Sequence, residues 1–219
     1  NGQNSSSVAV FDTSSYLLQQ LHPTDLAQAA GLINPVGDGN CGFRAVSVAV
    51  YGDEERWVEV KQKLLATLRS YQHVYTTYGL DLEEFEKKLG DVKAPCMLPN
   101  EQYMWFDTFG CPQLVADTFS RPVVLLGSSA RSFPGKGTEL DSQGNVVYNK
   151  SRMTFVPFFS LDPNVICDPI ILFLTDDHFY LLELKASEKS KTKVFEHWPP
   201  VNPMHLTIME NHRDICPAQ

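Results

Sequence analysis

The sequence predicts an α/β fold in which a small central β-sheet is flanked by helices. Between residues 41 and 119, apolar side chains recur at the three- and four-residue spacing of amphipathic helices. Two short and almost wholly apolar runs follow, over residues 123–126 and 169–174, and both are typical of buried strands. A third apolar run, residues 179–184, comes directly after a polar turn, so a strand hairpin is predicted there.

The first part of the chain is predicted to be mostly helical. Residues 1–15 begin with a stretch rich in Ser and Asn and are expected to form a flexible N-terminal end. One or two short helices are expected between residues 16 and 26. A longer helix is predicted to begin at Cys41, because the apolar residues after it recur at helical spacing, and to end at Gly52.

The longest helix is predicted over residues 53–77, where apolar residues hold one face. Three shorter helices are expected after it, over residues 82–90, 101–106 and 112–119. The polar and glycine-rich stretch 127–152 is expected to be an extended loop or a polar hairpin, and residues 153–159 are expected to return as a strand. Residues 194–200 are expected to add an edge strand or to pack over the sheet.

Length and charge limit the classes of protein. A chain of 219 residues with 43% hydrophobic content can bury the core of one domain. No apolar run reaches the 18 or more residues of a membrane span, so no membrane association is expected. The 26 acidic and 18 basic residues give a formal charge of −8, which makes nucleic acid a poor partner and a basic protein substrate a better one.

Cysteine and histidine spacing argues against disulfides and metal chemistry. The five cysteines are an odd number, widely spaced and without a Cys-x-x-Cys pair, which favours a reducing compartment and an intracellular protein, cytoplasmic or in the cytosol of a host cell. The six histidines include no pair at the helical spacing of metalloproteases. No metal and no cofactor are therefore expected. Cys111, which precedes a proline at a helix start, is expected to have a packing role.

Cys41 is the candidate nucleophile, because it follows a glycine-containing turn and begins a predicted helix. A helix N-terminus presents unpaired N–H groups and the positive end of the macrodipole, and both favour a thiolate and lower a cysteine pKa. The same N–H groups can hold an oxyanion. The alternative is that the segment is an Asx-type turn and that Cys41 is a small buried apolar residue.

His178 is the candidate base, because it lies where the predicted hairpin turns, at a strand end. A histidine there can reach a helix N-terminus that packs against the same end of the sheet, and a neighbouring aspartate can fix its tautomer. The alternative is that His178 is structural and that Asp176 and Asp177 only provide turn chemistry.

The motifs around these two residues resemble the ovarian tumour (OTU) family of cysteine proteases, which has a papain-like fold. The resemblance rests on Asp-Gly-Asn-Cys at residues 38–41, joined to Asp-His-Phe-Tyr at residues 177–180, and covers about residues 30–185. It implies that Cys41 is the nucleophile and that His178 is the general base. Family members draw the orienting residue from two positions before or after the histidine, which favours the carboxylate Asp176 over Tyr180. Asp177 is the next candidate, although neighbouring strand residues face opposite sides and it should point away if the pleat persists through the turn.

The resemblance also implies roles around the nucleophile and a substrate. Asp38 would brace the loop before the cysteine, and backbone N–H groups of residues 38–41, which include Gly39 and Asn40, would form the oxyanion hole. The substrate would be ubiquitin, polyubiquitin or a related modifier, cleaved by a monomeric deubiquitinase through a thioester. Acidic residues would steer the basic tail of the modifier, with candidates at Glu54, Glu55, Asp81, Glu83 and Glu84.

The sequence predicts one catalytic domain with a shorter segment on either side, and two alternative functions stay open. The catalytic domain is expected over residues 16–200, after the flexible end 1–15 and before a C-terminal tail 201–219. One alternative function is a catalytically silent module of the same fold that binds ubiquitin without cleaving it. The other is a cysteine hydrolase that acts on small amides or thioesters.

Overall fold

The computed structural model describes residues 9–11, 16–127, 152–159, 169–186 and 195–212. Its centre is a six-stranded sheet with the order β1-β2-β6-β5-β3-β4. Strands β3 and β5 run parallel, and the other neighbours run antiparallel. The strands are Ala9–Phe11 (β1), Ala29–Asn34 (β2), Val123–Gly127 (β3), Arg152–Phe155 (β4), Ile170–Thr175 (β5) and His178–Leu184 (β6). The predicted α/β fold class is confirmed.

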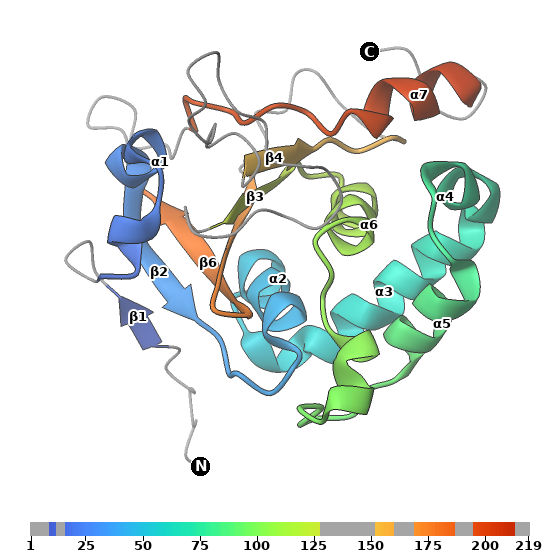
Figure 1. Ribbon diagram of the computed structural model, residues 1–219, viewed down its shortest axis with the longest axis horizontal. Helices are drawn as coiled ribbons and strands as arrows, with labels where there is room; N and C mark the ends of the chain where they lie inside the picture. The colour runs from blue at the N-terminus through green and yellow to red at the C-terminus, as the bar shows by residue number, and fades with distance from the viewer. Residues whose placement is uncertain (1–8, 12–15, 128–151, 160–168, 187–194, 213–219) are drawn as a thin grey trace.

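Helices α2 to α6 stand together on one side of the sheet (Figure 1). The α-helices of the described chain are Pro23–Gln28 (α1), Cys41–Tyr51 (α2), Trp57–Ser70 (α3), Gln72–Tyr78 (α4), Leu82–Gly90 (α5), Gly110–Phe119 (α6) and Met204–Asn211 (α7). Three 3-10 helices are Leu18–Gln20 (η1), Glu54–Arg56 (η2) and Pro99–Met104 (η3). The predicted helices beginning at Cys41 and over residues 82–90 and 112–119 are therefore present.

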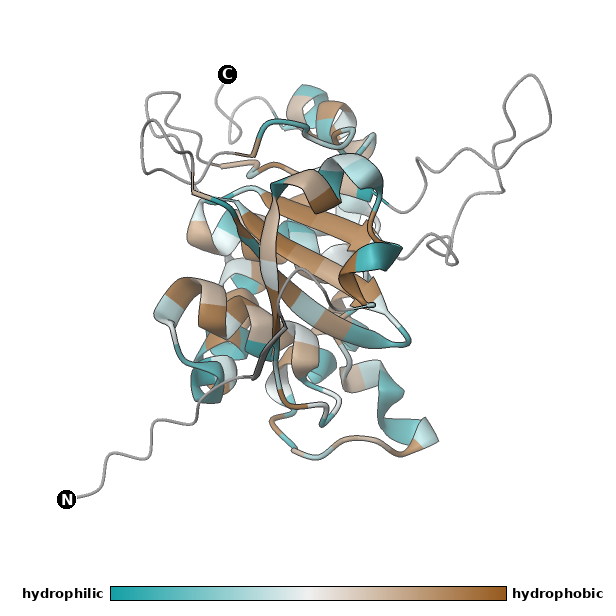
Figure 2. Ribbon diagram, turned by 90° about the vertical axis from the view of Figure 1, so that its left-hand side faces the viewer, coloured by the Kyte–Doolittle hydropathy of each residue, from teal (hydrophilic) through white to brown (hydrophobic). Residues whose placement is uncertain are grey.

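The sheet is buried on both faces, because alternate residues of its central strands enter two different cores. In β3, Val123 and Leu125 face the large core formed with the helices, whereas Val124 and Leu126 face a smaller core. The smaller core also holds Leu18 of η1 and side chains of β5 and β6. The strands coloured as strongly hydrophobic in Figure 2 are these central strands. Burial on both faces explains why β3 and β5 have continuous apolar sequences.

Two elements differ from the sequence prediction. The helix predicted over residues 53–77 is interrupted at Tyr71, which has non-helical dihedral angles (φ −130°, ψ 36°), so that η2, α3 and α4 replace one long helix. The change of direction brings Tyr75 and Tyr78 of α4 into the core with less than 2% exposure. Strand β2 was not predicted, because Ala29-Ala30-Gly31 is weak in strand propensity.

Both ends of the described chain belong to the sheet or pack beside it. Strand β1 lies within the predicted flexible end and pairs with β2. The segment after residue 198 runs beside β4: Thr154 N–H donates to Pro200 O, and Asn202 N–H donates to Thr154 O, both at 2.8 Å. Helix α7 then follows within the predicted tail. The expected loop over residues 127–152 lies almost wholly outside the described residues.

Candidate active site

The loop before Cys41 is held by the Asp38 carboxylate. Asp38 Oδ1 accepts the Asn40 N–H at 2.9 Å, and Oδ2 accepts the Arg44 guanidinium through Nε at 3.1 Å and Nη2 at 2.9 Å. Asp38 and Arg44 are both buried, so this ion pair is shielded from water. Helix α2 then begins at Cys41. Asp38 therefore fixes the turn that leads into Cys41.

The N–H groups at this helix start differ in availability. The Asn40 N–H is already engaged by Asp38. Among the described residues, the Cys41 N–H donates to no backbone carbonyl, as is normal for the first turn of a helix. An oxyanion next to Cys41 can therefore be met by the Cys41 amide, whereas Asn40 contributes to the shape of the loop.

A second loop, residues 91–105, is hydrogen-bonded to the loop before Cys41, which we call the cysteine loop. Cys96 N–H donates to Asp38 O at 2.8 Å, and the Trp105 indole N–H donates to Cys96 O at 2.8 Å. Gly39 lies between them with φ +88°, and a Cβ added there would come within 2.5 Å of Cys96 Sγ. A side chain at residue 39 would push the two loops apart, so the close approach requires glycine.

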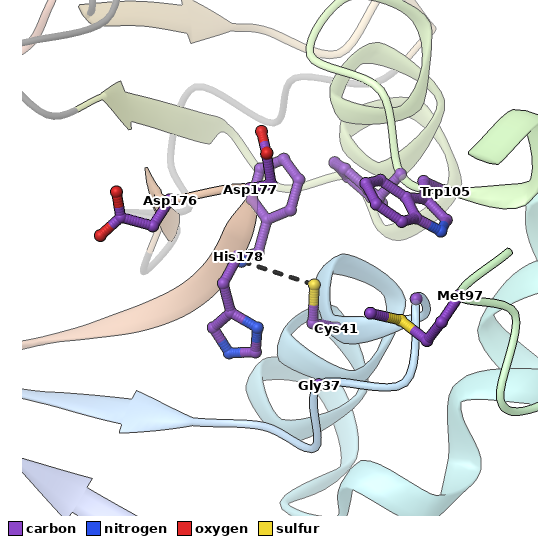
Figure 3. A pocket seen from close by; sticks show the side chains of 10 residues that line it. Gly37, Cys41, Met97, Trp105, Asp176, Asp177 and His178 are labelled. Atoms are coloured by element: carbon purple, nitrogen blue, oxygen red, sulfur yellow. Dashed lines mark hydrogen bonds between the residues drawn. The ribbon is translucent and has the colours of Figure 1, made fainter. Parts of the chain in front are cut away.

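Strands β5 and β6 bring the histidine to the same place. They form a hairpin in which Thr175 pairs with His178, and the two residues between them, Asp176 and Asp177, both have left-handed dihedrals (φ 50° and 61°). Such a two-residue turn matches the twist of the strands. The Phe179 N–H, directly after His178, donates to Cys41 Sγ at 3.5 Å. Figure 3 shows His178 beside Cys41 and this hydrogen bond.

Asn34, not Asp176, holds the His178 ring. Asn34 Oδ1 lies 2.8 Å from His178 Nε2. An amide oxygen can only accept, so Nε2 carries the proton and Nδ1 is left as an acceptor. Nδ1 faces Gly37 of the cysteine loop, where an added Cβ would come within 3.5 Å of it. The combination of Cys41, His178 and Asn34 has the composition of the Cys-His-Asn arrangement of papain-like proteases.

The structure therefore corrects the prediction for the orienting residue. Asp176 is exposed, and Figure 3 shows its carboxylate directed away from the His178 ring. The reason is the turn: its two left-handed residues break the alternation of side chains that would place Asp176 and His178 on one face. Asn34 reaches the ring from β2, the strand beside β6. The Tyr180 ring packs edge-on against His178 at 4.6 Å between centroids.

Burial favours a neutral thiol and a neutral imidazole. Burial raises the pKa of the Cys41 thiol, although the N–H groups of Phe179 and Gly42 oppose the shift. Burial also lowers the pKa of His178, although a hydrogen bond with the Pro35 carbonyl opposes it. The expectation of a lowered cysteine pKa is therefore wrong for the free protein, because removal from water outweighs the effect of the helix N-terminus.

A cavity of about 170 Å³ opens over Cys41. Its walls have different chemistry on two sides. The 91–105 loop and the residue after it contribute Met97, Trp105 and Phe106, whereas the β5–β6 turn contributes Asp176 and Asp177. Other lining residues are Gly37, Gly39, His178 and Phe179. The cavity thus combines an apolar wall, an acidic rim and a part of the cysteine loop that has no side chains.

The acidic residues expected to steer a substrate have other roles. Glu54 is buried and accepts the Val36 N–H at 2.8 Å. Glu55 pairs with Arg44, and Asp81 accepts the Glu84 N–H as the N-cap of α5. None of these residues lines the cavity over Cys41. The acidic residues that do line it, Asp176 and Asp177, were singled out from the sequence for their neighbouring histidine and not for their charge.

Other features of the described residues fit structural roles. Cys111 is buried, and its thiol lies 3.1 Å from Asp107 Oδ2 near the start of α6. Cys41, Cys96 and Cys111 are free thiols. In the described part of the chain, no three His, Cys, Asp or Glu side chains gather as a metal site requires. No described helix is both long and apolar enough to cross a membrane.

Comparison with known proteins gave matches among solved structures alone, since no family model and no curated protein matches the sequence. The viral OTU domain protease of Dera Ghazi Khan virus is 15% identical, with a TM-score of 0.46, over 70% of this chain and 80% of that chain. The OTU domain of OTUD1 is 19% identical, with a TM-score of 0.45, over 69% and 83%.

A third solved structure is a complex. The OTU of Hazara virus bound to ubiquitin is 14% identical to this chain, with a TM-score of 0.45, over 82% of this chain and 89% of that chain. These solved structures carry the name of the family that the two sequence motifs resemble. Identities and TM-scores this low leave the function to be argued from the geometry around Cys41.

Proposed function

We propose that the chain is a cysteine-dependent deubiquitinase, which hydrolyses the bond after the C-terminal glycine of ubiquitin or a ubiquitin-like modifier. The observation that carries the proposal is the arrangement of three side chains from separate elements. Cys41 begins a helix, the Phe179 amide donates to its sulfur, and the adjacent His178 has its Nε2 held by Asn34. A buried structural cysteine has no use for an oriented imidazole beside it.

These positions support the following reaction. His178 Nδ1 accepts the thiol proton as Cys41 Sγ attacks the carbonyl carbon. The oxygen of the tetrahedral intermediate accepts the Cys41 N–H. The intermediate collapses to a thioester when His178 gives the proton to the departing amine, usually that of a lysine. A water molecule, deprotonated by His178, then attacks the thioester and releases the modifier and the thiol.

The cavity supports a substrate with small residues next to the scissile bond and cationic residues further away. Gly37 and Gly39 line it without side chains, and Trp105 and Phe106 close one wall, so that a chain ending in two glycines fits. The rim residues Asp176 and Asp177 carry negative charge that suits a basic tail. Both properties belong to the C-terminal tail of ubiquitin that the family resemblance implies.

The test is reaction of the purified protein with ubiquitin that carries an electrophilic C-terminus, followed by intact mass. One adduct is expected for the unchanged protein, none for Cys41→Ala, and a strongly slowed reaction for His178→Ala. His73→Ala, at an exposed histidine of α4, is the matched control and should react normally. Binding of ubiquitin without an adduct would indicate a silent module, and absence of both would direct the search to small amides and other modifiers.

A further inference from the structure

Glu54 lies outside the cavity over Cys41, yet its carboxylate contacts the segment that holds the catalytic histidine. Glu54 belongs to η2, after helix α2, and is 5% exposed. Its Oε2 accepts the N–H of Val36, which precedes Gly37 in the loop before Cys41, at 2.8 Å. A buried carboxylate that serves one backbone N–H fixes the position of that peptide group.

The chain leaves the sheet before Val36 can pair with His178 of β6. The pairing of β2 with β6 includes Ile33 with Leu181. Continued by three residues, this register would place Val36 opposite His178. The ladder cannot continue in that way, because Pro35 has no N–H to donate. Glu54 therefore takes the N–H of a residue that has just left the sheet, and determines where the chain goes next.

The segment so positioned contacts the His178 ring through its first residue, Asn34. Asn34 Oδ1 accepts a hydrogen bond from the Nε2–H group at 2.8 Å. Gly37, on the other side of Val36, approaches Nδ1. The peptide group held by Glu54 therefore lies in the middle of the stretch that surrounds the imidazole.

The short helix η2, which contains Glu54 and Glu55, is connected to the helix of Cys41 through Arg44. Arg44 Nη1 donates to the Glu54 carbonyl at 3.4 Å and to Glu55 Oε1 at 3.0 Å, while its Nε and Nη2 hold Asp38. Because Arg44 lies in the first turns of α2, one buried network connects the helix of Cys41 with the segment that surrounds His178. The network fixes the distance between these two parts of the site.

We propose that Glu54 is a positioning residue, which holds Val36 so that Asn34 keeps the hydrogen bond that orients the His178 ring. For its catalytic consequence this inference rests on the proposed function. Loss of the carboxylate frees the Val36 peptide, lets the 34–37 segment move into water, and removes the orientation of the ring. Glu54→Gln keeps an oxygen that accepts the Val36 N–H and preserves the position.

The test follows His178 directly by NMR titration of its ring protons, assigned with His178→Ala. In the unchanged protein the pKa lies below the ordinary histidine value; in Glu54→Ala it is expected to rise toward that value, and in Glu54→Gln to stay low. Turnover of a ubiquitin substrate should fall about 10-fold in kcat for Glu54→Ala, with KM within about twofold. Glu83→Ala is the matched control, since Glu83 is an exposed residue of α5 that lies outside the network of Arg44 and Val36.

The titration of His178 and the reaction with ubiquitin test the positioning role and the proposed substrate separately. An unchanged His178 titration in Glu54→Ala overturns the positioning role, whatever happens with ubiquitin. A shifted titration in a protein that forms no ubiquitin adduct keeps the positioning role and refutes the proposed substrate. If Glu54→Ala does not fold, Glu54→Leu replaces it, because leucine fills the space and still offers no acceptor. Loss of activity in Glu54→Gln equal to that in Glu54→Ala would also overturn the proposal.

Discussion

The orientation of His178 by an amide gives the first prediction at the scale of single residues. In Asn34→Ala, Nε2 loses its acceptor, so the ring can rotate and its tautomer is no longer fixed. We expect kcat to fall about 10- to 100-fold with a small change in KM, because ring orientation matters mainly in the transition state. Asn34→Asp, which keeps an acceptor, should retain much more activity, as measured by cleavage of a fluorogenic ubiquitin substrate.

Asp176→Ala provides the comparison for that experiment. Its carboxylate is exposed and the His178 ring has its bond to Asn34, so we expect kcat to stay within about threefold of the unchanged protein. A large loss of kcat in Asp176→Ala together with normal turnover in Asn34→Ala would mean that the orienting residue changes when substrate binds.

The candidate nucleophile and base could be predicted from sequence because each lies in a local motif. Cys41 follows a glycine turn at a helix start, and His178 lies at a hairpin turn. The orienting residue could not be predicted in this way, because Asn34 and His178 are 144 positions apart and meet only through the adjacency of β2 and β6. Choosing the orienting residue from two positions before or after His178 assumes that side chains alternate between the two faces of one strand. The left-handed turn interrupts that alternation.

Whole elements could likewise be predicted where a local sequence pattern marks them, and not where the tertiary structure decides. Helices α2 and α5 were predictable, since both have apolar residues at helical spacing, and Gly52 ends α2 in a left-handed conformation. The break between α3 and α4 was not, because no glycine or proline marks Tyr71. There the burial of Tyr75 and Tyr78 decides the path of the chain, and burial of that kind depends on the tertiary structure.

The β5–β6 turn is the element whose charge is expected to select the substrate. In the double variant Asp176→Asn and Asp177→Asn the backbone should be preserved, since asparagine tolerates positive φ better than most residues. Rim charges contribute roughly 0.2–1 kcal/mol each, so loss of both should raise KM for a ubiquitin substrate about 2- to 30-fold while kcat stays nearly constant.

The salt dependence of KM checks the electrostatic origin of that effect. The unchanged protein should lose affinity as ionic strength rises, and the double variant should respond less. Glu83→Gln with Glu84→Gln, two exposed acidic residues of α5 that do not line the cavity, is the matched control with the same change in net charge. Equal KM values for the two double variants would exclude steering by the turn.

At the scale of the whole molecule, a buried carboxylate ties the helical side to the sheet. Asp117 of α6 accepts the Tyr75 hydroxyl at 2.8 Å and the Phe158 N–H at 2.5 Å. Gln113 also donates to it at 3.3 Å. Burial raises the pKa of Asp117 to about 7, although these three hydrogen bonds oppose the shift. The carboxylate thus joins α4, α6 and the segment after β4, away from the residues that line the Cys41 cavity.

This carboxylate should make the stability of the fold depend on pH. Between about pH 4 and 7 the folded state keeps a proton that the unfolded chain releases, so Asp117 makes the free energy of unfolding decrease as pH rises, and its contribution levels off above pH 7. The total change is at most about 4 kcal/mol. In Asp117→Asn this contribution disappears, and urea unfolding from pH 4.5 to 8 should show the difference from the unchanged protein. Glu83→Gln, at an exposed site, is the control and should leave the pH dependence intact. If the free energies of unfolding of Asp117→Asn and of the unchanged protein differ by the same amount at every pH, Asp117 is ionised in the folded state and the prediction is wrong.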